Sequence, residues 1–268
     1  CYRRVALDGT SREQEERPRS QLPNVELTFD GKWGALLRRT KEAAEIEIMR
    51  EAARLSDIGM VAAFAAARPG VSGRAVAAAS AAAMLEAGAE DASLQVAVGP
   101  ATAYMGTGDW IYQPRRVIQD GDMLLVDMAI KYQGYLGDQT RTAIVGKGTS
   151  EQRAIIDIVQ EAYRRSVAAM RPGASSPAIY RITTDLYEQK GWRKYFPHHY
   201  SHVRGLGCGL ARIAEGRKDV VQVGDALSCE PGLYIPGIGG ARFENMLLMT
   251  ENGIEELTKS PVDPVVGK

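Results

Sequence analysis

Two aspartates, Asp127 and Asp138, flank a short reversal of the chain and could bind a metal ion together. Apolar residues lead up to Asp127, and the turn-forming sequence Lys131–Gly134 lies between the two aspartates. If that turn closes an antiparallel hairpin centred between Tyr132 and Gln133, the aspartates lie directly opposite each other, with Cβ atoms about 4.5–5.5 Å apart. Two ionised carboxylates that close repel each other strongly. The pattern therefore predicts a positive charge between them, and a divalent metal ion is the obvious candidate.

An internal repeat with an offset of 103 residues extends this interpretation to four carboxylates. The repeat is carried by two pairs of matching segments: AARPGVS (66–72) with AMRPGAS (169–175), and QDGDMLLVD (119–127) with QVGDALSCE (222–230). Glu230 is the counterpart of Asp127, and Glu244 follows it as Asp138 follows Asp127. Two related halves can face each other across a pseudo-twofold axis, so we expect the four carboxylates to converge.

Four carboxylates and one imidazole suit a pair of divalent ions about 3.5–4 Å apart. Such a ligand set favours Mn, Co, Fe or Zn over a thiolate-based site. The imidazole must come from one of the three histidines in the chain, which are His198, His199 and His202.

Hydrophobic periodicity and helix-ending Pro-Gly pairs predict the elements that hold these residues. Helices are expected from Thr40 to the Pro69-Gly70 pair, from Ser72 to about Gly88, from Ser150 to the Pro172-Gly173 pair, and over about 177–190. Strands are expected at 93–99, on both sides of the central turn, and at 225–235 and 240–249. Residues 1–30 are polar, and we expect them to be irregular.

Composition excludes several classes of function. Acidic and basic residues balance at 33 each, which argues against a nucleic-acid partner. No apolar run reaches the ~18 residues that a membrane span needs. Three sparse cysteines indicate a reducing compartment, so we expect a cytoplasmic protein.

The order and spacing of the candidate ligands resemble the pita-bread metallopeptidases, the family of aminopeptidase P, prolidase, methionine aminopeptidase and creatinase. The resemblance covers roughly residues 35–260 and rests on Asp127-x10-Asp138, the following QTRT, His202-Val-Arg-Gly-Leu-Gly, Glu230-Pro-Gly-Leu-Tyr and Arg242-Phe-Glu244-Asn. It implies an α+β fold in which two duplicated helix-helix-hairpin halves form a curved antiparallel sheet covered by helices. It also implies a homodimer.

The resemblance divides the chain into a catalytic domain and a short lead. Residues 35–268 would form the pita-bread domain, with one half at about 40–149 and the other at about 150–260. Residues 1–34 would be a linker or the remnant of a missing N-terminal domain.

The resemblance also assigns the site. Two divalent ions, with Mn or Fe favoured, would be held by five ligands: Asp127, Asp138, His202, Glu230 and Glu244. Glu230 and His198 would handle protons, and Arg242 would orient a ligand carboxylate from behind. Peptidases of the family place a substrate-contacting histidine in the segment equivalent to 99–118, and a second one where this chain has Gly209. This chain offers other residues for the substrate pocket: Tyr104, Asp109, Trp110 and Tyr112.

Three functions follow as hypotheses. The first is a dinuclear-metal hydrolase of a C–N bond, similar to Xaa-Pro peptidases but with altered specificity, acting on a small peptide or another small molecule. The second is a metal-dependent lyase or other non-peptidase enzyme, since a Lewis-acid metal also assists elimination. The third is a catalytically silent binding module, which the five retained ligands disfavour.

Overall fold

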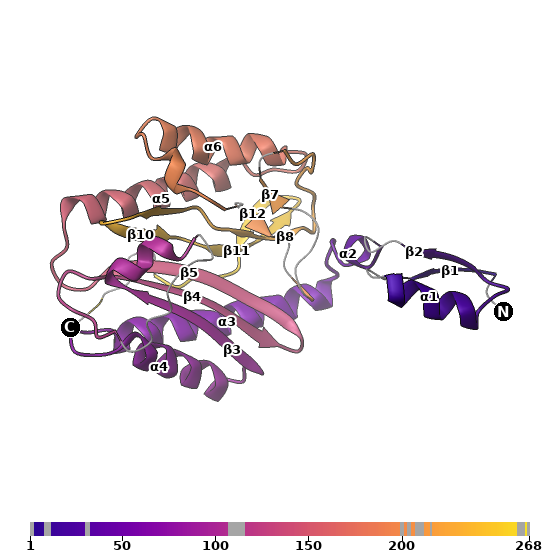
Figure 1. Ribbon diagram of the computed structural model, residues 1–268, viewed down its shortest axis with the longest axis horizontal. Coiled ribbons are helices and arrows are strands. Elements are labelled where there is room, and N and C mark those ends of the chain that lie inside the picture. The colour runs from indigo at the N-terminus through magenta and orange to yellow at the C-terminus, as the bar shows by residue number, and fades with distance from the viewer. Residues whose placement is uncertain are drawn as a thin grey trace.

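Two pairs of helices, one from each half of the chain, pack on the strands that carry the predicted carboxylates (Figure 1). The first pair is α3 (Ala43–Ala66) and α4 (Gly73–Glu86), and the second pair is α5 (Ser150–Ala169) and α6 (Ser176–Glu188). The computed structural model describes residues 3–7, 12–29, 33–106, 116–198, 201–202, 205–206, 212–214, 216–261 and 266. All four predicted helices are confirmed.

Hydroxyl side chains begin three of these helices. The Oγ of Ser72 accepts a hydrogen bond from the backbone N–H of Ala75, and the Oγ of Ser175 accepts one from Ala178. The cap of α5 is Thr149, paired with Gln152 in a capping box, so the helix starts at Ser150 as expected but is not capped by that residue. Thr149 has the extended backbone that a cap requires, whereas Ser150 is already the first helical residue.

The strands form two three-stranded antiparallel sheets and several two-stranded pairs. One sheet orders β3 (Asp91–Val98), β4 (Met123–Tyr132) and β5 (Tyr135–Ile144), and the other orders β12 (Gly253–Glu256), β11 (Asn245–Thr250) and β8 (Ala226–Cys229). The antiparallel pairs are β9 (Gly232–Ile235) with β10 (Gly239–Arg242), and β6 (Ser201–His202) with β7 (Arg212–Ile213). Single 3₁₀ turns follow β3 and α6: Gly99–Tyr104 (η1) and Arg193–Tyr195 (η2). The fold is α+β, as predicted.

The strand expected over 225–235 is divided in two at Glu230-Pro231. Proline has no N–H to donate to a sheet, so it separates β8 from β9. The strand expected over 240–249 is likewise divided, into β10 and β11, and Glu244 lies between them.

The register of the central hairpin differs from the prediction. Tyr132 pairs with Tyr135, so the two-residue turn is Gln133-Gly134, with φ values of +46° and +79° that are typical of a type I′ turn. Asp127 therefore lies opposite Thr140, and Asp138 lies opposite Ala129. The expectation that the two aspartates face each other directly is wrong, because the turn is centred one residue later than assumed. They are diagonal neighbours on the same face instead.

The structure confirms the internal repeat at an offset of 103 residues. Ser72 bridges to Val117, and its counterpart Ser175 bridges to Val220. The backbone N–H of Gly70 donates to Ile118, at 3.0 Å, as that of Gly173 donates to Val221, at 2.8 Å. Both glycines have positive φ, +89° and +83°. Each half thus ends its first helix and begins its second one in the same way.

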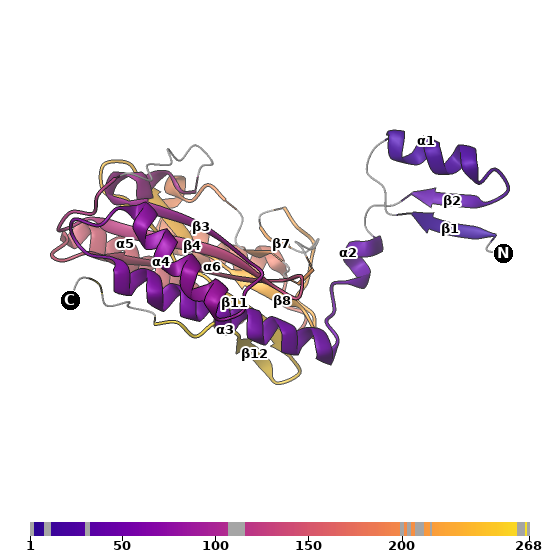
Figure 2. The same ribbon diagram turned by 90° about the horizontal axis from the view of Figure 1, so that it is seen from below.

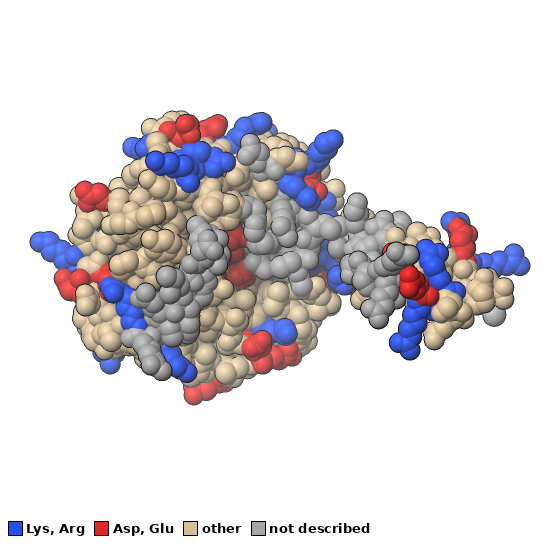
Figure 3. Space-filling view, in the orientation of Figure 1, with Lys and Arg blue, Asp and Glu red and all other residues tan. Residues whose placement is uncertain are grey.

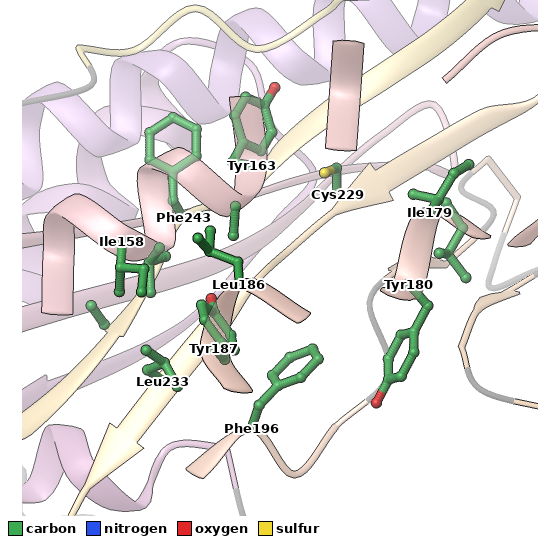
Figure 4. Packing of buried hydrophobic residues seen from close by; sticks show 14 of the residues in the cluster. Ile158, Tyr163, Ile179, Tyr180, Leu186, Tyr187, Phe196, Cys229, Leu233 and Phe243 are labelled. Carbon is green, nitrogen blue, oxygen red and sulfur yellow. The ribbon is translucent and has the colours of Figure 1, made fainter. Parts of the chain in front are cut away.

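Each half also has its own hydrophobic core, and the alternation of strand residues decides which side chains enter it. Even-numbered residues of β4, such as Val126 and Met128, are buried against α3 and α4. The core of the second half includes Ile158, Tyr187, Phe196 and Leu233, as Figure 4 shows. Odd-numbered residues of β4, Asp127 among them, therefore face away from the helices.

Residues near the N-terminus form a small β-α-β unit. Strands β1 (Arg4–Leu7) and β2 (Glu26–Phe29) are parallel, and helix α1 (Arg12–Gln21) connects them on one side, as Figure 2 shows. The short helix α2 (Trp33–Leu37) leads to α3. The expectation of an irregular segment is wrong, since α1 forms from the polar stretch that was interpreted as a linker. The domain boundary at residues 34 and 35 stays a prediction.

Candidate metal centre

Three of the predicted ligands meet at one point. Asp127, Asp138 and Glu244 each offer a carboxylate oxygen, and these oxygens lie within 4.8 Å of one another. Asp138 and Glu244 are buried, with 4% and 1% of their surfaces exposed, while Asp127 is half-buried. Buried carboxylates at this spacing repel each other unless a cation or a proton lies between them. The cluster is therefore the strongest candidate metal centre among the described residues.

The two halves bring these residues together through one short contact. Thr140 of β5 and Glu244, between β10 and β11, form an antiparallel bridge. The N–H of Glu244 donates to the carbonyl of Thr140 at 3.0 Å, and the N–H of Thr140 donates to the carbonyl of Glu244 at 3.4 Å. This bridge places Glu244 beside the face of the β4–β5 hairpin that carries both aspartates.

Glu230 belongs to the same cavity. The cavity has a volume of about 240 Å³, and the residues that line it are Ser93, Gln95, Asp127, Ala129, Asp138, Glu230, Arg242 and Glu244. Glu230 is 7% exposed and accepts a hydrogen bond from the Oγ of Ser228 at 3.1 Å. Acidic side chains are visible at the centre of the face shown in Figure 3.

Only part of the predicted His202 site can be described. The backbone of His202 lies in β6, opposite Arg212 of β7. The neighbouring Ser201 donates its hydroxyl to the carbonyl of Ser228 in β8, the strand that leads to Glu230. The main chain at His202 is thus close to the carboxylate site, while the side chain lies outside the described residues.

Of the predicted substrate residues, the structure describes Tyr104. Asp109, Trp110 and Tyr112, together with His199 and Gly209, lie outside the described residues. Tyr104 belongs to η1, where 42% of its surface is exposed, and it is not among the residues that line the cavity.

Arg242 lies against the cluster. Its Nη2 forms an ion pair with Oδ2 of Asp127, and its Nε donates to Oγ1 of Thr140 at 3.1 Å. Burial alone would lower the pKa of Arg242, but the surrounding negative charges, with Asp127 the foremost, raise the pKa well above its usual value. Arg242 is therefore a permanent positive charge beside Oδ2 of Asp127.

A chain of polar groups connects Arg242 to His198. Nη1 of Arg242 donates to the hydroxyl of Tyr234 at 3.2 Å, and that hydroxyl is 2.9 Å from Nε2 of His198. Burial raises the pKa of Tyr234 to about 12 despite the nearby guanidinium, so its phenol stays protonated at neutral pH. The ring of Tyr234 packs closely on Gly106, whose position has no room for a Cβ atom. His198 does not line the described part of the cavity but reaches Asp127 through this chain.

Four side chains of the site have no role in the sequence-based predictions: Ser93, Gln95, Thr140 and Tyr234. The two-residue period of a strand could have identified Thr140, which is two residues from Asp138 and so lies on the same face. Once β3 is placed beside β4, Gln95 pairs with Asp127 and Ser93 pairs with Ala129. Thr140 is the most connected one. Its hydroxyl lies 3.1 Å from Oδ1 of Asp127 and 2.8 Å from Oε2 of Glu244.

The donor set fits divalent metal ions. Asp127, Asp138, Glu230 and Glu244 supply only carboxylate oxygens, and hard oxygen ligands suit Mn, one of the two ions that the prediction favours, as well as Mg. The single guanidinium of Arg242 does not balance four carboxylates, so the cavity retains negative charge for a cation.

Comparisons with known proteins agree with this site. The family model described as metallopeptidase family M24 matches residues 47–251. The chain is 33% identical over 227 residues to the Xaa-Pro dipeptidase of Pyrococcus furiosus, an alignment that covers 84% of this chain and 64% of the relative. The chain thus spans less than two thirds of that protein's length.

Solved structures show the same fold. The prolidase from Pyrococcus horikoshii OT3 superposes with a TM-score of 0.89 at 27% identity, covering 98% of this chain and 76% of that one. The Xaa-Pro dipeptidase from Bacillus anthracis has a TM-score of 0.89 at 30% identity, covering 98% and 74%. The predicted pita-bread fold is confirmed. With a family match over most of its length and a carboxylate cluster shared between its two halves, the chain belongs to metallopeptidase family M24.

Proposed function

We propose that this chain is the catalytic part of a dinuclear-metal-dependent hydrolase that cleaves the amide bond of small Xaa-Pro peptides. The observation that carries the proposal is the buried cluster of Asp127, Asp138 and Glu244, which shares one cavity with Glu230. The relatives of this chain include an Xaa-Pro dipeptidase and a prolidase, which supports the proposed substrate class.

The proposed ligands of the two ions are Asp127, Asp138, His202, Glu230 and Glu244. Bound divalent ions supply Lewis acidity, which lowers the pKa of water and stabilises negative charge on a reacting carbonyl oxygen. Arg242 and Thr140 have a separate task in this proposal. They hold the Asp127 carboxylate in one orientation, because both contact its oxygens.

Glu230 is the proposed proton carrier. Its carboxylate lines the cavity beside Asp127 and Asp138, and the hydroxyl of Ser228 donates to one of its oxygens, which fixes the carboxyl group where it can exchange protons with a molecule in the cavity. His198 is proposed to assist protonation of the leaving nitrogen, and its hydrogen-bond contact with Tyr234 fixes the ring.

Altered specificity is part of the proposal. The described lining residues other than the carboxylates and Arg242 are Ser93, Gln95 and Ala129, which are small or polar. Such a wall suits a small or polar residue of the substrate better than a large apolar one.

Metal loading and product analysis test the function. Protein freed of metal with a chelator is reloaded with Mn²⁺ and incubated with Xaa-Pro dipeptides, with Xaa-Ala dipeptides as the comparison. We expect release of proline and incorporation of solvent oxygen into the new carboxylate in ¹⁸O-labelled water. Elimination incorporates no solvent oxygen, so an unlabelled product would favour the lyase hypothesis. A wild-type protein that binds less than one Mn²⁺ per chain would contradict the proposal.

Three further parts of the hypothesis stay predictions. Mn or Fe is proposed as the bound ion, which elemental analysis of the purified protein would test. A homodimer is proposed, and sedimentation would measure it. A cytoplasmic location is proposed as well. Among the described residues, no helix has the length and apolarity that a membrane span requires.

A further inference from the structure

Strand residues beside the metal centre point alternately to its two sides. In β5, Asp138 and Thr140 contribute to the carboxylate cluster, whereas Gln139 and Arg141 form hydrogen bonds on the opposite side. Asn245, which follows Glu244, also bonds away from the cavity. Three polar side chains therefore lie directly behind the ligands. All three are buried, with exposures of 0%, 1% and 3%.

One segment of chain covers these three side chains. We call residues 257–261 the back strap. It has no helix or strand, yet Leu257, Thr258 and Ser260 are buried, at 6%, 1% and 5% exposure. An irregular segment is seldom buried unless its backbone polar groups have partners. The partners of the back strap lie in α3, β5 and β11.

The back strap is fixed to α3 through Asp57. The backbone N–H of Lys259 donates to Asp57 at 2.9 Å, and that of Ser260 donates at 2.8 Å. Ser260 also donates its hydroxyl to Oε1 of Gln139 at 2.5 Å. Nε2 of Gln139 in turn donates to Ser56 at 2.7 Å. The residue next to Asp138 is therefore held between the back strap and α3.

Arg141 connects the back strap to the bridge between the two halves. Its Nη1 donates to the carbonyls of Thr140, at 2.9 Å, and Glu244, at 2.6 Å. Its Nη2 donates to the carbonyl of Ser260 at 3.1 Å and to Oδ1 of Asn245 at 2.7 Å, and its Nε donates to the carbonyl of Pro261 at 3.1 Å. All five N–H donors of the guanidinium are satisfied, and every acceptor is a neutral oxygen.

Asn245 completes the network on the other half. Its Oδ1 accepts from Thr258 at 3.0 Å as well as from Arg141, and its Nδ2 donates to the hydroxyl of Tyr163 at 2.9 Å. The backbone N–H of the next residue, Met246, donates to Thr258 at 3.1 Å. The back strap thus bonds to the residues that follow both Asp138 and Glu244, although these ligands come from different halves.

We infer that the back strap and Arg141 act as a positioning device for the metal centre, which holds Asp138 and Glu244 at the separation that a bound ion needs. The inference rests on the proposed function. Its physical reason is that the bridge of Thr140 and Glu244 consists of only two backbone hydrogen bonds, while the carboxylates that it brings together repel each other. The hydrogen bonds of the back strap, on the face of β5 opposite the carboxylates, resist that repulsion.

Metal affinity tests the inference independently of catalysis. Arg141→Lys keeps the charge but replaces five planar donors with at most three. Asp57→Ala removes the acceptor that anchors Lys259 and Ser260, at a site on α3 outside the cavity lining. The control is Arg50→Met, which removes an exposed ion pair between α3 and Glu255 that does not reach the bridge. Circular dichroism first establishes that each metal-free protein is folded, and calorimetry then measures Mn²⁺ binding.

We expect at least a tenfold weaker Kd for Mn²⁺ in Arg141→Lys and Asp57→Ala, and no more than a twofold change in Arg50→Met. If Arg141→Lys does not fold, Asp57→Ala decides. Folded variants that melt at a lower temperature but bind Mn²⁺ as tightly as the wild type would overturn the inference, since the back strap would then be structural only. A wild-type protein without Mn²⁺ binding would instead overturn the proposed function, and the inference with it.

Discussion

Thr140 and Glu244 join the two halves of the molecule at the candidate metal centre. Their backbones form an antiparallel bridge, and the hydroxyl of Thr140 lies 2.8 Å from Oε2 of Glu244. The same hydroxyl lies 3.1 Å from Oδ1 of Asp127 and accepts from Nε of Arg242. A hydroxyl has one hydrogen to donate, so it can satisfy only one of the two carboxylates at a time. The hydroxyl oxygen of Thr140 therefore connects one carboxylate of each half, Asp127 and Glu244.

Replacing Thr140 by Val tests that link. The two side chains have nearly the same shape, so the substitution removes the hydroxyl with little change in packing. It leaves Nε of Arg242 without this acceptor, and we expect the free energy of unfolding to fall by about 1–3 kcal/mol. Urea titration measures the change. Thr250→Val is the control, since the bonds that its hydroxyl forms with described residues lie within the turn after β11. Equal effects in both variants would contradict the special position of Thr140.

Asp138→Asn removes one negative charge from the cluster without changing its size. Because a neutral amide binds divalent ions more weakly than a carboxylate does, we expect at least one Mn²⁺ per chain to be lost and the proposed hydrolysis to fall more than 100-fold. Elemental analysis after gel filtration measures the metal. Asp122→Asn is the matched control, because Asp122 is a carboxylate paired with Arg116 and does not line the cavity. Retention of both ions in Asp138→Asn would exclude Asp138 as a ligand.

Tyr234→Phe interrupts the chain from His198 to Arg242 and keeps the ring that packs on Gly106. We expect kcat to fall by roughly 100-fold, the lower end of the usual contribution of general acid–base catalysis, with the metal content unchanged. Steady-state kinetics with elemental analysis measures both. Tyr180→Phe is the comparison, since that tyrosine packs on Phe196 from α6 and does not touch Arg242. A change in metal content instead of kcat would indicate that Tyr234 acts by orienting Asp127.

The sequence allowed the carboxylate cluster and the duplicated architecture to be predicted because both depend on residue spacing. Residues that recur at an offset of 103, such as Ser72 and Ser175, have the same structural role in each half. A carboxylate five residues after each Gly-Asp pair is likewise visible without a structure, as Asp127 and Glu230 are.

Register could not be predicted in the same way, because it depends on which two residues form the turn. The sequence pattern predicts Lys131–Gly134 as the turn, but Gln133 and Gly134 adopt the left-handed backbone that a type I′ turn requires, and the pairing shifts accordingly. The back strap had no signal in the sequence at all. Its residues are irregular, and their burial depends on partners far away along the chain, such as Asp57.

Gln95→Leu tests the cavity wall. Gln95 pairs with Asp127 across β3 and β4, and it lines the cavity. A leucine there replaces a polar group with an apolar one of similar size, so we expect the kcat/KM ratio of Leu-Pro to Ser-Pro to rise by about 10-fold. Gln222→Leu is the control, because Gln222 lies in the turn before β8, away from the cavity lining. An unchanged ratio with hydrolysis intact would remove Gln95 from the specificity wall without affecting the proposed function.

Lys41 gives a prediction about pH. It is 7% exposed, and its ammonium donates to the carbonyls of Arg38 and Arg39 at 3.0 Å. Burial lowers the pKa of Lys41 from 10.5 to about 8 in the folded protein. Between pH 8 and 10.5 the unfolded chain therefore binds a proton that the folded protein has lost, and stability from this group rises with pH.

The size of that rise follows from the shift in pKa. At 1.36 kcal/mol per pKa unit, Lys41 contributes at most about 3 kcal/mol to the increase in unfolding free energy between pH 8 and 10.5. Lys41→Met has no charge to bury, so its unfolding free energy should rise less than that of the wild type over this range. Below pH 8 both states of the wild type are protonated, and the difference between the two proteins should become constant. Urea titrations at a series of pH values measure this, and parallel curves for the two proteins would show that Lys41 keeps its ordinary pKa.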